Sequence, residues 1–272
     1  MNFVAISVIT INYNNLIGLR NTITSVISQE YNKIQYIIID GGSTDGSAEF
    51  IAGVADKLYY WVSEKDNGIY DAMNKGIKFS QGEYLLFLNS GDCFSDNKVL
   101  HRFQENIISN SDTDIFYGNI YFVNELGNLG KHLWTHPSDI TLDFLEYENI
   151  NHQASLIKSS LFKELGVYPE NYKLASDFWF FLQCFLHDKV FTHIPLPLID
   201  YDMTGSSNVS KDIYLKEKRD IWNDLVPLFV QRILKDNKKL TIKNEQYKHI
   251  ISYKLVNYAI RLNNLYQKFK KN

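Results

Sequence analysis

Residues 34–46 of the chain, IQYIIIDGGSTDG, join a short apolar run to a glycine-rich turn. The branched apolar residues up to Ile39 are typical of a β-strand, because such side chains pack well on a pleated sheet. The residues from Asp40 to Gly46 are mostly glycine, serine, threonine and aspartate, a composition that favours turns. The stretch therefore predicts a strand over 35–39, followed by a turn and a short helix.

The same alternation continues on both sides of this stretch. Further strands are expected at residues 5–11, 58–62 and 84–88, and helices at 17–28 and 69–79. Strands that alternate with helices through short connections predict an α/β fold with a mostly parallel sheet and helices on both faces. Ligands of such sheets bind beyond the carboxyl ends of the strands. The polar clusters expected at that edge are Asn12–Asn14, Asp40, Glu64–Asn67 and Asn89–Asp92.

Beyond residue 110 the pattern changes, first to strands and loops and then, from residue 211, to helices. The expected elements are strands at 115–123, 151–157 and 190–202, and helices at 177–186, 214–222, 225–234 and 246–269. Apolar side chains recur at three- and four-residue steps in the last helix. We therefore expect one domain over residues 1–210, with halves 1–110 and 111–210, and a helical C-terminal extension over 211–272.

Length and composition favour a globular domain with its own core. The 272 residues are 45% hydrophobic, so a core can form without disulfide or metal support. The two cysteines, Cys93 and Cys184, lie far apart, which favours a reducing compartment. The chain begins without a basic leader and contains no run of about 18 apolar residues. We expect a cytoplasmic protein.

The net charge of −3 conceals an uneven distribution. Residues 231–272 carry eleven basic and two acidic side chains, a net charge of +9, whereas residues 1–230 carry 17 basic and 29 acidic ones. A basic amphipathic helix can lie on an anionic membrane surface, which predicts peripheral attachment at the inner face of the cell membrane. Alternatively, the tail packs on the domain or on a second copy, as in a homodimer. The acidic body and the absence of a known motif argue against a nucleic acid partner.

Four side chains near the expected strand ends are candidates for ligand binding, for a structural role, or for either. Asp92 can hold Mg²⁺ or Mn²⁺ together with phosphate oxygens, or it can cap a helix or stabilise a turn. Asp40 can accept hydrogen bonds from a base or a ribose. Tyr13 can stack on a base or lie at the rim of the sheet. Asp45 is expected to cap the helix that follows it.

Taken together, four stretches resemble the inverting glycosyltransferases of family 2, which have the GT-A fold. They are SVITINYN (7–14), IIIDGGSTDGS (37–47), SEKDNGIYDAMNKG (63–76) and GEYLLFLNSGD (82–92). The third stretch is similar to a signature of bacterial exopolysaccharide and O-antigen transferases, including colanic-acid-type enzymes. Order and spacing match over residues 4–205, so the linked motifs are more specific than any one alone.

The resemblance implies a nucleotide-sugar donor, a UDP-sugar in the first place and a GDP-sugar in the second. It also implies a saccharide or lipid-linked acceptor. The backbone of Ile11 and the ring of Tyr13 would hold the base. Asp92 would hold Mn²⁺ or Mg²⁺ as part of the family's Asp-x-Asp motif, but Asn89 and Gly91 occupy the other usual acidic positions. The motif therefore keeps a single carboxylate, and the resemblance does not establish how tightly it binds a metal. The donor site implied by the resemblance comprises Ile11, Tyr13, Asp40, Asp66, Asn67, Asp71 and Ser90.

The resemblance also implies a catalytic base, because the acceptor hydroxyl must lose a proton as it attacks the anomeric carbon. The matching position is Asp177, although Ser176 precedes it where the family commonly has another acid. Asp177 could instead cap its helix. His152 is the candidate on the acceptor side, where it contacts phosphate or acceptor, or is simply structural.

Two other functions compete with glycosyl transfer. A sugar nucleotidyltransferase would need a glycine-rich loop with a basic residue after the first strand, and residues 12–17, NYNNLI, contain neither. A catalytically weak or inactive nucleotide-sugar-binding subunit is compatible with the reduced metal motif. Release of nucleoside diphosphate from a donor panel would distinguish the transferase from the inactive subunit.

Overall fold

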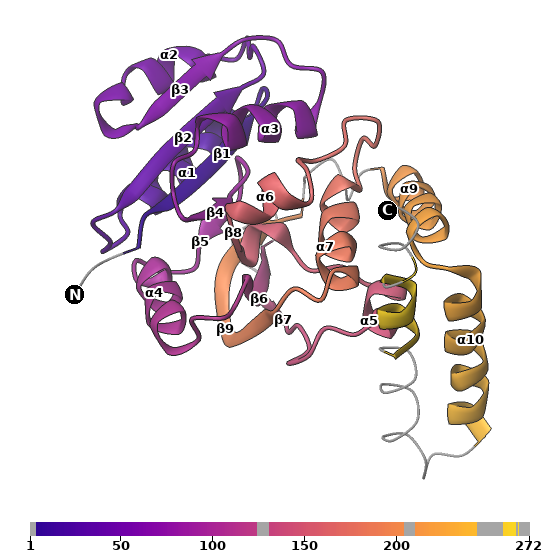
Figure 1. Cartoon of the computed structure of the whole chain (residues 1–272). Helices are drawn as coiled ribbons and strands as arrows, with labels where there is room; N and C mark the ends of the chain where they lie inside the picture. The colour runs from indigo at the N-terminus through magenta and orange to yellow at the C-terminus, as the bar shows by residue number, and fades with distance from the viewer. Residues whose placement is uncertain (1–3, 124–130, 204–209, 244–257, 265, 267–272) are drawn as a thin grey trace.

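The computed structural model describes residues 4–123, 131–203, 210–243, 258–264 and 266 (Figure 1). Most of the helix expected at 246–269 therefore lies outside the described residues. Within the described part, the predicted alternation of strands and helices in the first half is confirmed. The strand 115–123 and the helix 69–79 have the predicted bounds.

One sheet runs through the described part of the chain, in the order β3-β2-β1-β4-β8-β6-β9-β5, and β7 pairs with β6. The first four strands in this order are mutually parallel, as predicted. Towards the other edge the sheet is mixed: β4–β8, β8–β6, β6–β7 and β9–β5 are antiparallel, and β6–β9 is parallel. The strands are β1 Ile6–Asn12, β2 Ile34–Asp40, β3 Tyr60–Ser63, β4 Tyr84–Phe87, β5 Cys93–Phe94, β6 Ile115–Val123, β7 His132–Trp134, β8 Ser155–Lys158 and β9 Phe191–Asp202.

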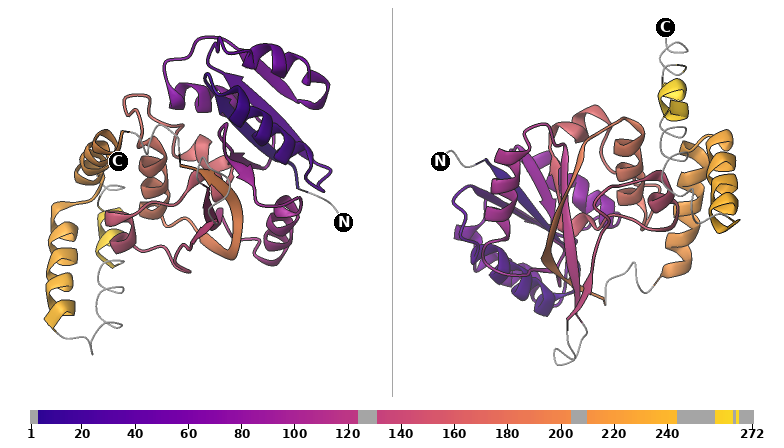
Figure 2. Two further views of the ribbon diagram at one scale, coloured as in Figure 1. Left: turned by 180° about the vertical axis from the view of Figure 1, so that it is seen from behind. Right: turned by 90° about the horizontal axis from the view of Figure 1, so that it is seen from below.

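Helices cover both faces of the sheet (Figure 2). The α-helices are α1 Leu16–Ile27, α2 Ser47–Ala52, α3 Ile69–Phe79, α4 Val99–Ser109, α5 Leu142–Tyr147, α6 Ser160–Glu164, α7 Ser176–Leu186, α9 Lys211–Leu225 and α10 Leu228–Lys243. The sequence did not predict α5 and α6, because helices of six and five residues are too short to show a helical period. The expected strand at 151–157 begins instead as a short 3₁₀ helix, η2 His152–Ala154.

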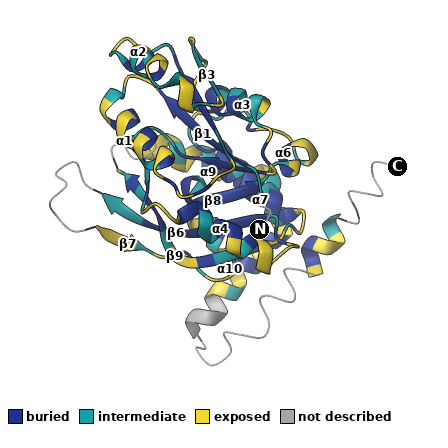
Figure 3. Cartoon of the chain, turned by 90° about the vertical axis from the view of Figure 1, so that its left-hand side faces the viewer, coloured by how far each residue is buried: buried dark blue, intermediate teal, exposed yellow. Residues whose placement is uncertain are grey.

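Alternation along the central strands divides the core in two. Successive strand residues point to opposite faces, so Val8 packs with α1 and α4 whereas Ile9 packs with α3 and α7. Both side chains are fully buried, as are Ile38 and Ile39 of β2. The dark band through the middle of Figure 3 shows this burial. A strand covered on both faces requires an uninterrupted apolar run, which explains the sequence IIID.

The C-terminal helices pack on the face that carries α3 and α7. Ile221 and Trp222 of α9 and Val230 of α10 are buried in the same core cluster as Phe178 of α7. In Figure 1 these helices lie on the side of the molecule away from α1 and α2. None of the helices that the structure describes is long and apolar enough to cross a membrane.

Candidate active site

A cleft of about 1180 Å³ opens at the carboxyl ends of β1, β2 and β4. It extends from the segment before α3, across the turn after β4, to α7 and the end of β9. Gly41 allows its floor to close tightly, because an added Cβ would lie 2.5 Å from Asp66 Oδ2 and 3.2 Å from Tyr13 Cδ2. The edge of the sheet that the sequence indicated for a ligand is therefore the edge that is hollowed.

The cleft brings together most of the predicted site residues. Those that line it are Ile11, Tyr13, Asp66, Ser90, Asp92, His152 and Asp177. Those that do not line it are Asp40, Asn67 and Asp71. Tyr13 is 67% exposed, which leaves the residue accessible to a planar ligand. Residues from both halves of the predicted domain thus share one cavity.

Asp40 is fully buried below the cleft and holds strand ends together. Its carboxylate accepts hydrogen bonds from the Ser43 backbone N–H (2.9 Å), the Ser63 hydroxyl (2.6 Å) and Asn12 Nδ2 (2.7 Å). Burial by itself would raise the pKa of Asp40, but the hydrogen bonds lower it overall, first among them one from the Ser43 hydroxyl (2.6 Å). The structure therefore gives Asp40 a cross-strand role, and its predicted contact with a base stays a prediction.

The segment before α3 is organised by its own acids. Asp71 accepts from the Asn67 backbone N–H (2.8 Å) and lies 3.5 Å from Lys75 Nζ, so it closes the first turn of α3. Asp66 accepts from the Gly68 N–H (3.1 Å), and Gly68 has φ 129°, a conformation that favours glycine. Burial raises the pKa of Asp66, although the Gly68 hydrogen bond and the Lys75 charge oppose the shift. Of these acids, Asp66 is the one that faces the cleft.

Asp92 is a buried carboxylate at the end of the turn after β4, and 4% of the residue is exposed. Burial raises its pKa to about 7, against the opposing effect of the hydrogen bond from the Asp202 N–H (2.9 Å) and the nearby His152. Asp202 also lines the cleft. Asp202 was not predicted as a site residue, although it lies directly at the end of a strand, here β9, as Asp40 lies at the end of β2.

These two acids suit a hard divalent cation that other ligands help to hold. Within the residues that the structure describes, no group of three His, Cys, Asp or Glu side chains is placed to hold a metal. Mg²⁺ and Mn²⁺ are commonly held by one or two carboxylates together with substrate phosphates and water. The donor set of Asp92 and Asp202 therefore fits a cation that arrives with a diphosphate.

Asp177 lies in the first turn of α7 and its carboxylate is bound by side chains from three other segments. Tyr70 donates to Oδ1 (3.0 Å), Asn149 Nδ2 donates to Oδ2 (3.1 Å), and His152 Nδ1 lies 3.2 Å from Oδ2. The N-cap of α7 is Ala175, which makes no side-chain cap. The Asp177 carboxylate thus lies at the cleft as a hydrogen-bond acceptor whose position these side chains fix. Tyr70 and Asn149 were not predicted as its partners.

A buried cation lies behind Asp177. Lys218 of α9 is 5% exposed, donates to the Glu148 carbonyl oxygen (2.7 Å) and lies 4.8 Å from the ring centroid of Phe178. Burial lowers its pKa to about 8, against the opposing charges of Glu148 and Asp177. The packing of α9 on α7 therefore encloses a positive charge near the predicted base.

This pKa shift makes stability depend on pH. Between about pH 8 and 10.5 the unfolded chain binds the Lys218 proton and the folded chain does not, so the free energy of unfolding rises with pH, by at most about 3 kcal/mol. We expect Lys218→Met, which replaces the ammonium group by an apolar end, to remove this rise. Urea unfolding of both proteins at pH 7.5, 9 and 10.5 measures it, and parallel curves would contradict it.

The sequence has clear relatives. It matches the family model described as glycosyl transferase family 2 over residues 7–167. An uncharacterized glycosyltransferase of Mycobacterium tuberculosis is 35% identical over 201 residues, which cover 74% of this chain and 76% of that protein. A PGL/p-HBAD biosynthesis glycosyltransferase of Mycobacterium bovis is 29% identical over 173 residues, which cover 62% of this chain and 64% of that protein.

Solved structures share the architecture at low sequence identity. S. aureus TarS 1–349 in complex with UDP-GlcNAc has a TM-score of 0.66 and 16% identity, over 84% of this chain and 69% of that chain. This chain spans 40% of the longer TarS chain. The mannosyltransferase PcManGT from Pyrobaculum calidifontis, in complex with GDP-Man and Mn²⁺, has a TM-score of 0.60 and 14% identity, over 87% and 65% of the two chains. These likenesses establish the fold.

Proposed function

Because the chain belongs to glycosyl transferase family 2 and has the GT-A fold, we propose that this glycosyltransferase moves a sugar from a nucleoside diphosphate to a saccharide or lipid-linked acceptor, with inversion. The observation that carries the proposal is that Tyr13, Asp66, Asp92 and Asp177 line one cleft. The donor half would be residues 1–110 and the acceptor half 111–210. We place this transfer in bacterial surface polysaccharide synthesis, in line with the biosynthetic name of the M. bovis relative.

In the proposed mechanism the chain's own residues bind, orient and deprotonate. Tyr13 stacks on the base, and Asp66 accepts hydrogen bonds from the sugar. Asp177 takes the proton from the acceptor hydroxyl. The oxygen of that hydroxyl attacks the anomeric carbon, and the nucleoside diphosphate departs. Asp92 and Asp202 would hold Mn²⁺ or Mg²⁺, which when bound stabilises the negative charge that grows on the diphosphate.

A donor panel tests this proposal. UDP-, GDP- and TDP-sugars are added to the full-length protein with and without Mn²⁺, and thermal shift is read alongside release of nucleoside diphosphate. A UDP-sugar is the first candidate and a GDP-sugar the second, since neighbours of this fold bind both classes. Binding raises the melting temperature, and the shift grows with the affinity and the concentration of the ligand. Binding without turnover, with any acceptor tried, would favour the inactive subunit.

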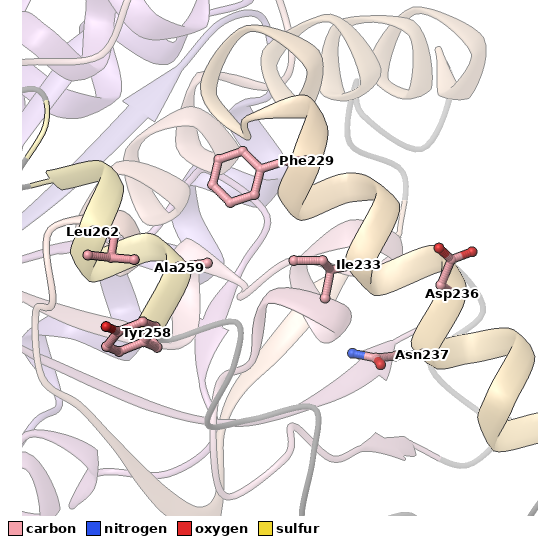
Figure 4. Close-up of a pocket in the computed structure, with 7 residues that line it drawn as sticks. All are labelled: Phe229, Ile233, Asp236, Asn237, Tyr258, Ala259 and Leu262. Atoms are coloured by element: carbon pink, nitrogen blue, oxygen red, sulfur yellow. The ribbon is translucent and has the colours of Figure 1, made fainter.

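We also propose that the C-terminal helices attach the enzyme to an anionic membrane surface on its cytoplasmic side. Figure 4 shows Phe229 and Ile233 of α10 facing Tyr258 and Leu262 across a pocket of about 410 Å³. Leu228, which precedes Phe229 at the start of α10, is 69% exposed. Basic side chains on the same helix are Arg232, Lys235 and Lys238. Exposed apolar side chains next to basic ones are typical of helices that bind anionic lipid.

A vesicle assay tests the attachment. We expect Leu228→Ser combined with Phe229→Ser to weaken pelleting with phosphatidylserine-containing vesicles at least about tenfold, because each side chain contributes on the order of 1.5 kcal/mol or more when buried. Ile108→Ser is the matched control, since Ile108 is 61% exposed on α4, far from α10 in Figure 1. Equal pelleting of all three proteins would refute the proposal. A change of oligomeric mass would indicate instead that a second copy covers this face.

A further inference from the structure

The imidazole of His152 lies between two side chains of the cleft. Its Nδ1 is 3.2 Å from Asp177 Oδ2, and its Nε2 is 3.2 Å from Asn89 Nδ2. The side chains of His152 and Asp177 are 12% and 11% exposed. Asn89, His152 and Asp177 thus form a row that joins the turn after β4 to the first turn of α7.

The hydrogen bonds along this row are all donated in one direction, from Asn89 towards Asp177. Asn89 places its amide nitrogen, which can donate but not accept, against Nε2 of His152, and its Oδ1 is buried without a partner among the described residues. A neutral ring that accepts at Nε2 carries its proton on Nδ1, and that proton points at Asp177 Oδ2. The carboxylate therefore receives hydrogen bonds at Oδ2 from both His152 and Asn149, and at Oδ1 from Tyr70.

Hydrogen bonds to the backbone hold the segments that carry Asn89 and His152. The N–H of Ser90, next to Asn89, donates to the Ile11 carbonyl oxygen (3.0 Å), and Asn15 Nδ2 donates to the Ser90 carbonyl oxygen (3.1 Å). In the middle of the row, Ser155 Oγ donates to the Asn151 carbonyl oxygen (2.8 Å) and fixes η2, which carries His152. The imidazole therefore lies between two backbone segments that the fold holds in place.

We propose that Asn89 and His152 are a pair of positioning residues that fix the tautomer of the imidazole and, through it, the orientation of the Asp177 carboxylate for proton abstraction. This inference rests on the proposed role of Asp177 as the base. It gives a physical reason for an amide at position 89, where the family commonly has an acid. An aspartate there could only accept, so the ring would need protons on both nitrogens to keep its bond to Asp177.

The tautomer can be measured without substrate. In the full-length protein labelled with ¹⁵N-histidine, the His152 signals are those lost in His152→Asn. We expect the wild-type ring to be neutral with its proton on Nδ1. We expect Asn89→Ala to shift the ring towards the Nε2–H form, and Asn89→Asp to give a ring protonated on both nitrogens. An Nε2–H ring in the wild type, or ring signals unchanged in Asn89→Ala, would overturn the proposal.

Kinetics separate positioning from substrate contact. With the nucleotide sugar that gives the most turnover in the donor panel, we expect His152→Ala to lower kcat about 10- to 100-fold and to leave the donor KM unchanged. His152→Asn should retain more kcat, because its amide can donate from near the Nδ1 position. A raised KM with unchanged kcat would overturn the proposal, because His152 would then bind substrate. Full transfer by Asp177→Asn would instead refute the proposed base and leave the tautomer result standing.

Discussion

Asp177→Asn is expected to lower the rate of sugar transfer by about 10²- to 10⁴-fold, the usual contribution of a general base. The amide keeps the shape of the carboxylate but cannot take the acceptor proton. Nucleotide binding should persist, because the contacts predicted for the nucleobase and the diphosphate do not involve Asp177. They lie on β1, before α3 and after β4. The rate of sugar transfer and the equilibrium binding of the donor, measured on the same preparation, test the expected loss of transfer and the expected retention of binding.

The control for this variant must exclude misfolding. Tyr70, Asn149 and His152 all point donors at Asp177, so the neutral amide can leave one of them unpaired, at a cost of about 1–3 kcal/mol. Circular dichroism and thermal unfolding should show a folded protein with a slightly lower Tm. Asp112→Asn, in the exposed turn before β6, is the matched substitution and should transfer normally. Transfer above one tenth of the wild-type rate in Asp177→Asn would rule out Asp177 as the base.

Asp92→Asn is expected to have the second largest effect, because it removes the buried negative charge that the proposed cation would meet. Turnover should fall about 10²- to 10³-fold, in line with the loss of one electrostatic contact to the charge of the transition state. In the wild type, Mn²⁺ should strengthen UDP binding, and in the variant this effect should disappear. Calorimetric titration of UDP with and without Mn²⁺ measures it, and an unchanged Mn²⁺ effect would refute the proposed ligand.

The same variant should be more stable than the wild type at neutral and alkaline pH. The pKa of Asp92 is raised from 3.8 to about 7, so the folded chain holds this proton where the unfolded chain has lost it. Stability from this group is complete below about pH 4 and is lost as pH rises through about 7, by at most about 4 kcal/mol without a cation. Asparagine can still accept from the Asp202 N–H and carries no such cost. Equal slopes of stability against pH in both proteins would contradict the buried charge.

The candidate site shows where local sequence stops being sufficient. Asp66 and Asp71 are both aspartates and lie five residues apart, yet Asp66 faces the cleft while Asp71 closes a helical turn. Asp40 ends its strand as expected, but Asn12, Ser43 and Ser63 take up its oxygens. Two of these three partners lie on other segments of the chain. The sequence shows that a carboxylate lies at the end of a strand. It does not show whether the oxygens of that carboxylate bind other residues of the protein or a ligand.

The sequence by itself determined the β–α alternation, the buried central strands and the edge at which ligands meet the sheet. These follow from hydrophobic period and turn chemistry, which act over a few residues. The tertiary structure alone decided that Tyr70 and Asn149 hold Asp177, 107 and 28 residues away from it, and that Asp202 joins Asp92. Such contacts depend on how distant strands order in the sheet and how α7 and α9 pack on it, and no local period encodes that order.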